Sequence, residues 1–82
     1  MNKYDLVIVE WDEREFLEIV KTFTIGWVFR QGEDILTILS SVSEDGNYLT
    51  IEIPQKCVVK ITVLLTAENC FLWEKIDAWT KT

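Results

Sequence analysis

Apolar and polar residues alternate with a period of two over much of the chain, a pattern that predicts strands. Residues 3–11 (KYDLVIVEW) are apolar on both faces, which indicates a strand covered on both sides. Residues 21–31 alternate cleanly, and Gly26 within them indicates a bend or a close backbone approach. On the face that we expect to be buried lie Phe23, Ile25, Trp27 and Phe29.

Two short polar segments separate the next strands. Residues 32–34 (GED) predict a tight turn before a strand over residues 35–43. Residues 44–47 (EDGN) predict a hairpin turn, in which Gly46 or Asn47 takes a positive φ.

The only proline of the chain lies between two further alternating runs. Pro54 lacks a backbone donor and must end the strand before it, so residues 54–56 (PQK) predict one short 3₁₀ turn. Such a turn between two strands is the corner found in Sm-like and SH3-like small barrels. The apolar residues on both sides of it share one parity and are expected to face one interior: Leu49, Ile51, Ile53, Cys57, Val59, Ile61, Val63 and Leu65.

Two segments have helical spacing. In residues 12–20, Asp12 is a candidate N-cap with Glu15 at the third position, and four apolar residues form a face: Phe16, Leu17, Ile19 and Val20. In the tail, the recurrence of Cys70, Trp73, Ile76 and Trp79 predicts a helix over about residues 67–79.

Together these elements predict a mainly β (α+β) fold. We expect a small five-stranded Sm/SH3-like barrel with a short helix near residues 12–20 and a C-terminal helix. The 82 residues, 1–82, are expected to form a single domain.

Charge and composition limit the classes of binding partner that we expect. The net charge is −6 and only eight residues are Lys or Arg, which argues against nucleic acids and anionic membranes. No apolar run approaches the roughly 20 residues of a transmembrane helix, and the start does not resemble a signal peptide. We therefore expect a cytoplasmic protein with reduced thiols. The high apolar share, 49% with four tryptophans, favours a homo-oligomer.

The chain has little catalytic or metal-binding chemistry. It contains no histidine, and Cys57 and Cys70 lie on apolar faces, so we predict no enzyme, no cofactor and no zinc site. The acidic residues of segment 12–18 are interpreted as a solvated face, with a hard-cation site or docking to a basic partner as alternatives.

The candidate binding residues are tryptophans, serines and one arginine. Ser40, Ser41 and Ser43 interrupt an apolar strand. They lie on its exposed face or satisfy a bulge, or they line a phosphate or nucleotide pocket between subunits. Trp27 is expected in the core. The other tryptophans flank the barrel and either pack there or contact a partner or ligand. The full set is Trp11, Trp73, Trp79, Ser40, Ser41 and Arg30.

Three segments between residues 24 and 61 carry a resemblance. They are GWV at 26–28, SSVSEDGN at 40–47 and IPQKCVVKI at 53–61. This pattern resembles a group of short uncharacterised proteins of bacteriophages and their bacterial hosts. The chain departs from that group in its acidic segment 12–20 and its tryptophan-containing tail. The resemblance implies a phage-type protein, in the host cytoplasm, that binds and blunts a host factor.

Two functional hypotheses follow. The first is a non-enzymatic small binding protein, a phage-type inhibitor or regulator that self-associates and binds a host protein. The alternative is an anti-defence module that sequesters a nucleotide signal between protomers, with Arg30, Lys56 and Lys60 as a cationic spot. A structural interaction protein without a small ligand is a third possibility.

Overall fold

Five antiparallel strands form one sheet in the computed structural model, which describes residues 1–69. The prediction of a mainly β fold with five strands is confirmed. Two short 3₁₀ turns, η1 and η2, complete the described chain. In chain order the elements are β1 (Leu6–Glu15), β2 (Glu18–Gln31), β3 (Ile35–Val42), β4 (Tyr48–Pro54), η1 (Gln55–Cys57), β5 (Val58–Leu65) and η2 (Ala67–Asn69).

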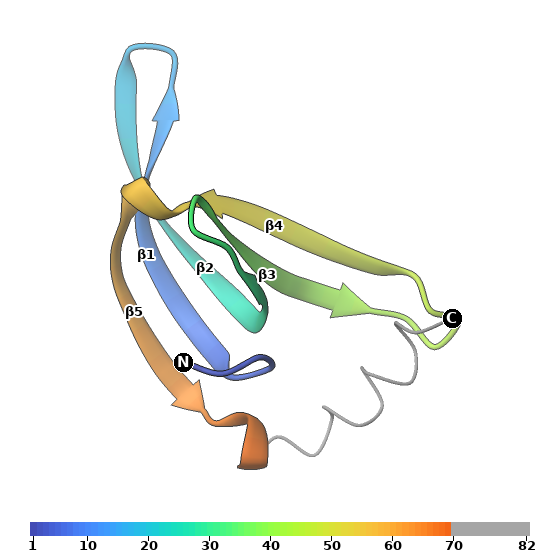
Figure 1. Cartoon of the computed structure of the whole chain (residues 1–82). Helices are drawn as coiled ribbons and strands as arrows, with labels where there is room; N and C mark the ends of the chain where they lie inside the picture. Colours follow the sequence, from blue (N-terminus) through green and yellow to red (C-terminus); the bar gives the residue numbers. More distant parts are fainter. Residues whose placement is uncertain (70–82) are drawn as a thin grey trace.

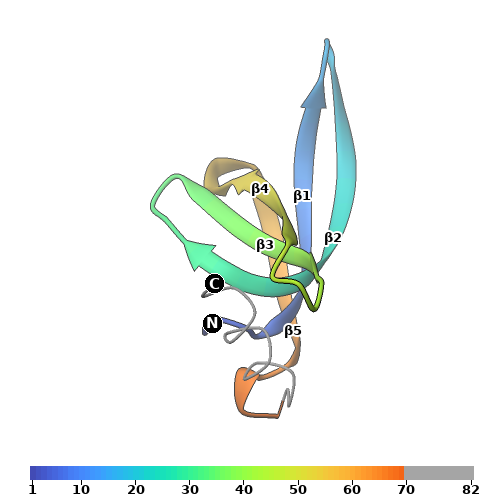
Figure 2. The same cartoon turned by 90° about the vertical axis from the view of Figure 1, so that its right-hand side faces the viewer.

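The strands are arranged in the order β4-β3-β2-β1-β5. Each neighbouring pair is antiparallel, and β5 pairs with β1 rather than with β4, from which it follows along the chain. The sheet is strongly curved, and one hairpin extends far beyond it (Figure 1, Figure 2). Register shifts interrupt the ladders β1–β5, β2–β3 and β3–β4, and such irregularities sharpen the local twist.

The proline corner is confirmed. Pro54 ends β4 with an extended backbone (φ −60°, ψ 126°), and η1 follows directly. The N–H of Val58 donates to the carbonyl of Gln55, closing the turn before β5 begins. The chain thereby crosses from one edge of the sheet, β4, to the other edge, β5.

The main core lies on one face of the curved sheet. It contains Val7, Val9, Trp11, Val28, Leu36, Ile38 and Ile53, with Cys57, Val58 and Ile61 packed partly against it. Trp11 is buried, and its Nε1–H donates to the hydroxyl of Thr24 at 2.9 Å. Cys57 is a free thiol in a half-buried position.

The predicted buried face of β2 is wrong for Phe23 and Ile25, whereas Trp27 and Phe29 on the same face are half-buried. Phe23 and Ile25 are 60% and 59% exposed, whereas Thr24, Gly26 and Val28 face the interior. The cause is close packing of β3 against the β2 backbone. A Cβ built on Gly26 would lie only 2.5 Å from Ile38 Cγ2. The close approach predicted at Gly26 is therefore present.

A second, smaller cluster lies around Tyr4 and Leu39. It includes Trp27, Phe29, Val42 and Ala67 as partly buried members. Trp27 is thus half-buried in this cluster and not part of the main core. Within the described residues, its buried Nε1 has no hydrogen-bond partner.

The shared inward parity on both sides of Pro54 holds only near the corner. Ile53, Cys57 and Ile61 pack into or against the main core, but Leu49 is 67% exposed and Val59 55% exposed. Val59 is displaced by a register shift, since Lys60 pairs with Glu10 and Val58 with Trp11, which leaves Val59 as an extra residue on β5. Leu49 keeps the parity of Ile53 along β4, but it pairs with the exposed Ser41, beyond the part of β3 that lies in the main core.

The predicted helix near residues 12–20 is also wrong. The β1–β2 ladder continues without interruption from Leu6↔Trp27 to Glu15↔Glu18, so this segment forms strands and a turn. A two-turn helix depends on packing of its apolar face, and Phe16 and Leu17 pack against nothing among the described residues. Pairing between β1 and β2 satisfies backbone hydrogen bonds without packing of an apolar face, so the segment forms strands rather than a helix.

The predicted C-terminal helix, about residues 67–79, lies outside the described residues except for its start, where Ala67–Asn69 forms η2. The predicted hairpin turn at residues 44–47 is confirmed. There Gly46 has φ 93°, and the N–H of Ser43 donates to the carbonyl of Asn47 at 2.8 Å. Within residues 1–69, no helix has the length and apolarity to cross a membrane.

Candidate functional site

The outer parts of β1 and β2 form a two-stranded arm, defined here as residues 12–21. β5 pairs with β1 only as far as Trp11↔Val58, and β3 pairs with β2 only from Trp27 onward. Beyond these points, β1 and β2 have only each other as described strand neighbours, and the arm projects away from the sheet (Figure 1, Figure 2). An isolated two-stranded hairpin is marginally stable in water. The pairing of β1 with β2 within the arm therefore stabilises the arm only marginally.

The tip of the arm is apolar and fully exposed. Phe16 and Leu17 have relative exposures of 105% and 103%, the largest among the exposed apolar residues of the described chain. They are the two turn residues between Glu15 and Glu18. Exposing a phenylalanine and a leucine side by side costs hydrophobic free energy unless a partner covers them.

The backbone of the tip is strained. Phe16 has φ 54°, in the left-handed region where glycine or asparagine is favoured in two-residue hairpin turns. An L-residue with a Cβ loses about 1–2 kcal/mol in this conformation. Strained backbone of this kind concentrates at functional sites, so the tip is a candidate interaction element.

Charge is distributed unequally over the two faces of the arm. On the face continuous with Trp11, cross-strand pairs place Glu13 beside Val20 and Glu15 beside Glu18. This face has three carboxylates and no cation. Like charges directly opposite each other weaken a hairpin. A basic partner surface would relieve the repulsion.

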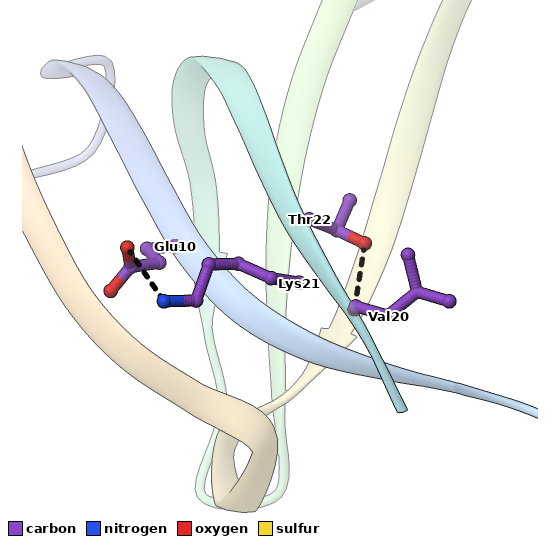
Figure 3. Close-up of polar contacts among 4 residues, drawn as sticks. All are labelled: Glu10, Val20, Lys21 and Thr22. Carbon is purple, nitrogen blue, oxygen red and sulfur yellow. Dashed lines mark hydrogen bonds and ion pairs between the residues drawn. The ribbon is translucent and has the colours of Figure 1, made fainter. Parts of the chain in front are cut away.

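The opposite face is balanced in charge. Arg14 pairs with Ile19 and Asp12 with Lys21, and Lys21 Nζ lies 3.8 Å from Glu10 Oε1. Figure 3 shows Lys21 reaching across to Glu10 at the base of the arm. This ion pair is mostly exposed on its lysine side, so its contribution to stability is small.

A hydroxyl also ties the two strands together near the base. Thr22 Oγ1 lies 3.2 Å from Glu13 Oε2 and 3.2 Å from the carbonyl of Val20, and the second contact is drawn in Figure 3. Thr22 has one hydroxyl proton and donates to one of these acceptors at a time. The interaction fixes Glu13 on the acidic face of the arm.

Apolar side chains continue from the arm onto the outer face of β2. Ile19, Phe23 and Ile25 alternate along this strand, and each is exposed by about 60%. They share one face of the sheet because side chains two residues apart point the same way. These three are the most exposed apolar residues of β2.

The residues predicted as binding residues do not form one site. Trp11 is buried in the main core, and Arg30 is exposed on β2 opposite Thr37. Ser40 lies at the register shift of β3, where its hydroxyl donates to the carbonyl of Leu49 at 3.1 Å. Trp73 and Trp79 lie outside the described residues.

Ser41 lines a shallow hollow of about 320 Å³ together with Val42, Ser43, Asn47, Tyr48 and Leu49. The polar groups of Ser43 and Asn47 in this hollow are engaged in the turn itself. The Ser43 hydroxyl and the Asn47 N–H both donate to Asp45, and these hydrogen bonds lower the pKa of the Asp45 carboxyl. Arg30 is not among the lining residues.

A second hollow, of about 440 Å³, lies at the proline corner. Its lining includes Lys56 together with the carboxylate residues Glu33 and Asp34. Gln55 also lines this hollow, and it donates two hydrogen bonds to backbone carbonyls, from its N–H to Asp34 and from its Nε2 to Gly32. Two carboxylates beside one ammonium disfavour a phosphate group here. Within residues 1–69, no group of three or more His, Cys, Asp or Glu side chains is arranged to hold a metal ion.

The sequence pattern places Phe16 and Leu17 on a helix face and does not predict their exposure at a turn. The available signal is the symmetric placement of Glu15 and Glu18 around the apolar pair. Compared with known proteins, the chain matches no protein-family model, no curated protein sequence and no solved structure. The resemblance to phage proteins therefore rests on its residue pattern alone.

Proposed function

We propose that this chain is a non-enzymatic binding protein that docks onto another protein through its β1–β2 arm. The observation that carries the proposal is the exposure of Phe16 and Leu17, 105% and 103%, at the end of a projecting hairpin. A phenylalanine held at positive φ in solvent is unfavourable in the free protein. Burial of both side chains in a partner pocket would offset that cost.

The charges of the arm indicate what kind of surface the partner presents to it. Glu13, Glu15 and Glu18 lie on one face beside the apolar tip. We infer an apolar pocket in the partner with lysines or arginines along one side of it. Charge complementarity of this kind raises the association rate and fixes the orientation of docking.

The biological setting is a proposal that rests on the resemblance. A phage-type inhibitor or regulator that occupies a pocket on a host protein needs no catalytic group of its own. An apolar anchor surrounded by charge is the usual form of an interaction hot spot. The proposal assigns that role to Phe16 and Leu17.

The finer architecture belongs to the same proposal. We expect the curved sheet to be of the Sm- or SH3-like small-barrel type, with β4 and β5 as its two open edges. The strand order and the 3₁₀ corner after Pro54 support this classification. The barrel serves as a rigid base that presents the arm.

The test compares capture by the wild-type chain and by an arm variant. The double substitution Phe16→Gly and Leu17→Asn introduces a sequence favoured where only the first of the two turn residues has a positive φ, and it removes the apolar tip. Immobilised protein is incubated with bacterial lysate, and retained proteins are identified by mass spectrometry. We expect a protein retained by wild type to be lost with the double variant.

The matched control is Leu49→Asn, which removes an exposed leucine from β4, far along the sheet order from β1. This variant should retain the same protein as wild type. Raised salt should also weaken capture, because the acidic face of the arm contributes. Equal capture by wild type and by the double variant, or no capture by wild type, would contradict the proposal.

A further inference from the structure

The two strands of the arm have different outer edges. Where β5 stops pairing with β1, the open edge of β1 comprises residues 12–15, and every one of them is charged. Where β3 stops pairing with β2, the open edge of β2 comprises residues 18–26, with Glu18 and Lys21 as its only charged residues and no proline. Natural proteins protect edge strands with charges, prolines, bulges or short length. The open edge of β2 is therefore the less protected of the two.

This edge is regular, and its backbone groups are unpaired. The ladder between β1 and residues 18–27 contains no register shift. Just beyond it, Val28 donates its N–H to the carbonyl of Asp5, and its carbonyl accepts from the N–H of Tyr4, so both of its backbone groups face the β1 side. Because backbone groups alternate in direction along a strand, the groups that face away from β1 are those of residues 19, 21, 23 and 25. No strand of the described chain pairs with them.

The same residues carry the apolar row on the outer face of β2. Ile19, Phe23 and Ile25 are each exposed by about 60%. Lys21 interrupts the row, but its Nζ lies 3.8 Å from Glu10 Oε1 on β1 and so reaches away from the open edge (Figure 3). A strand added to this edge would pair with the backbone groups and cover the apolar side chains together. In such strand addition, backbone hydrogen bonds supply affinity and alternate side chains supply specificity.

Charge on the other face of the arm indicates what the added strand contains. Glu18 lies on that face of β2, and Glu13 and Glu15 lie beside it on β1. Side chains of an added strand alternate between the two faces, so every second one lies on this acidic face. Lysine or arginine at these positions would meet the three carboxylates. A second copy of this chain would instead bring a net charge of −6 toward them, which is unfavourable.

We propose that a segment of another protein adds to the open edge of β2 as an antiparallel strand in which apolar residues alternate with lysine or arginine. The inference rests on the proposed docking through the arm and names the backbone contact that holds the partner. The segment occupies the place that β3 would take if it continued to pair beyond Leu39. In an antiparallel ladder, residues with facing backbone groups lie directly opposite each other. The apolar residues of the segment, which lie opposite Ile19, Phe23 and Ile25, therefore form the hydrogen bonds.

The probe is a short synthetic peptide of alternating valine and lysine, titrated into the isotope-labelled full-length chain and followed by NMR. We expect saturable shifts of the amides of residues 18–26 and slower amide exchange at Ile19, Phe23 and Ile25. N-methylation of the valines blocks the donors that face β2 and should weaken binding at least about tenfold. N-methylation of the lysines alters only the far edge of the peptide and should leave binding unchanged. A peptide with its valines and lysines in two separate blocks should bind weakly.

Protein variants provide the second comparison. Phe23→Lys removes an apolar contact and places a cation at the edge, so it should weaken peptide binding. The matched control is Leu49→Lys, the same change at an exposed leucine on β4, and it should bind as wild type does. The double variant Phe16→Gly and Leu17→Asn retains the edge and should also bind the peptide. Circular dichroism of each variant confirms that it is folded.

Four results would overturn the inference: no saturable shifts within residues 18–26, equal binding of the alternating and block peptides, tighter binding of the valine-methylated than of the lysine-methylated peptide, or full binding by Phe23→Lys. Its failure is distinguishable from failure of the proposed docking through the tip. If lysate capture depends on Phe16 and Leu17 but the peptide does not bind, only the strand addition is wrong. If the peptide binds but lysate capture does not depend on the tip, only the role of the tip is wrong.

Discussion

The backbone N–H of Ala67 donates a hydrogen bond to Asp5 Oδ1 at 2.7 Å, which joins residues 62 positions apart in the sequence. The other carboxylate oxygen, Oδ2, accepts from the N–H of Asn2 at 2.8 Å. Asp5 is only 3% exposed. A single buried carboxylate therefore holds the N-terminal turn and the start of η2 in place beside the second apolar cluster.

Replacement of this carboxylate by an amide should destabilise the fold. In Asp5→Asn one of the two acceptors becomes an NH₂ group that faces a backbone donor. We expect a loss of about 1–3 kcal/mol in the free energy of unfolding, measured by urea denaturation. Asp45→Asn, at an exposed turn, is the control and should cost less. Equal stability of Asp5→Asn and wild type would show that the carboxylate is not a structural tie.

Gly26 should not tolerate even one added methyl group. Its Cβ would lie 2.5 Å from Ile38 Cγ2 and 2.6 Å from the carbonyl oxygen of Leu39. The backbone of β3 cannot move away without breaking its ladder with β2, so we expect Gly26→Ala to cost about 2 kcal/mol. Gly32→Ala is the matched control, because its Cβ would meet its nearest atom, the Ile35 carbonyl oxygen, at 3.1 Å. Similar denaturation midpoints for both variants would contradict the close packing of β2 and β3.

A change at the tip of the arm should stabilise the free protein. Phe16→Gly removes an aromatic residue with a β-carbon from a positive-φ conformation that glycine adopts without strain. Since the ring is fully exposed, no burial is lost, and we expect a gain of about 1 kcal/mol in denaturant experiments. Leu17→Asn, at a residue without positive φ, should change stability little. A destabilised Phe16→Gly variant would mean that the ring packs against the protein.

The turn at residues 43–47 should respond to acid through Asp45. The Ser43 hydroxyl and then the Asn47 N–H lower the pKa of this carboxyl. A depressed pKa in the folded state means that the contribution to stability is present above the ordinary aspartate pKa, about 3.9. It is lost as the pH falls through the folded value.

NMR titration of the Asp45 side chain measures this directly. Ser43→Ala removes the largest cause of the shift and should move the pKa of Asp45 back toward its ordinary value. Because the carboxyl is exposed, the effect on global stability should be slight. An Asp45 that titrates at or above the ordinary value in wild type would refute the hydrogen-bonded turn.

Local chemistry explains which parts of the fold could be predicted from sequence. Pro54 must end a strand wherever it lies, and Gly46 takes a positive φ without strain, so the corner and the hairpin turn were both identified. Gly26 was correctly associated with a close approach. These residues restrict the backbone independently of the rest of the fold.

Features that depend on distant contacts were missed. The apolar parity of β2 favoured Phe23 inside, but the close contact between Gly26 and Ile38 selects the opposite face. Register shifts displaced Val59 from the interior, and no local signal encodes them. The tip residues Phe16 and Leu17 match a helical period because Ile19 and Val20 follow them at helical spacing.

For the candidate site, the acidic charge of the arm could be predicted from the sequence, but its projection from the sheet could not. The acidic residues of segment 12–18 were recognised, and docking to a basic partner was among the alternatives. The sequence does not reveal that β1 and β2 extend beyond their neighbours, because this depends on where β5 and β3 stop pairing. Exposure of the arm is a property of the whole sheet.

The central claim is that residues 12–21 form a projecting hairpin with an uncovered apolar tip. Interproton contacts from NMR on the isotope-labelled, full-length chain test it most directly. We predict cross-strand contacts between Arg14 and Ile19 and between Asp12 and Lys21, with rapid amide exchange at Phe16 and Leu17. Contacts between residues three apart along residues 12–20, as in a helix, or slow exchange at the tip would contradict the account.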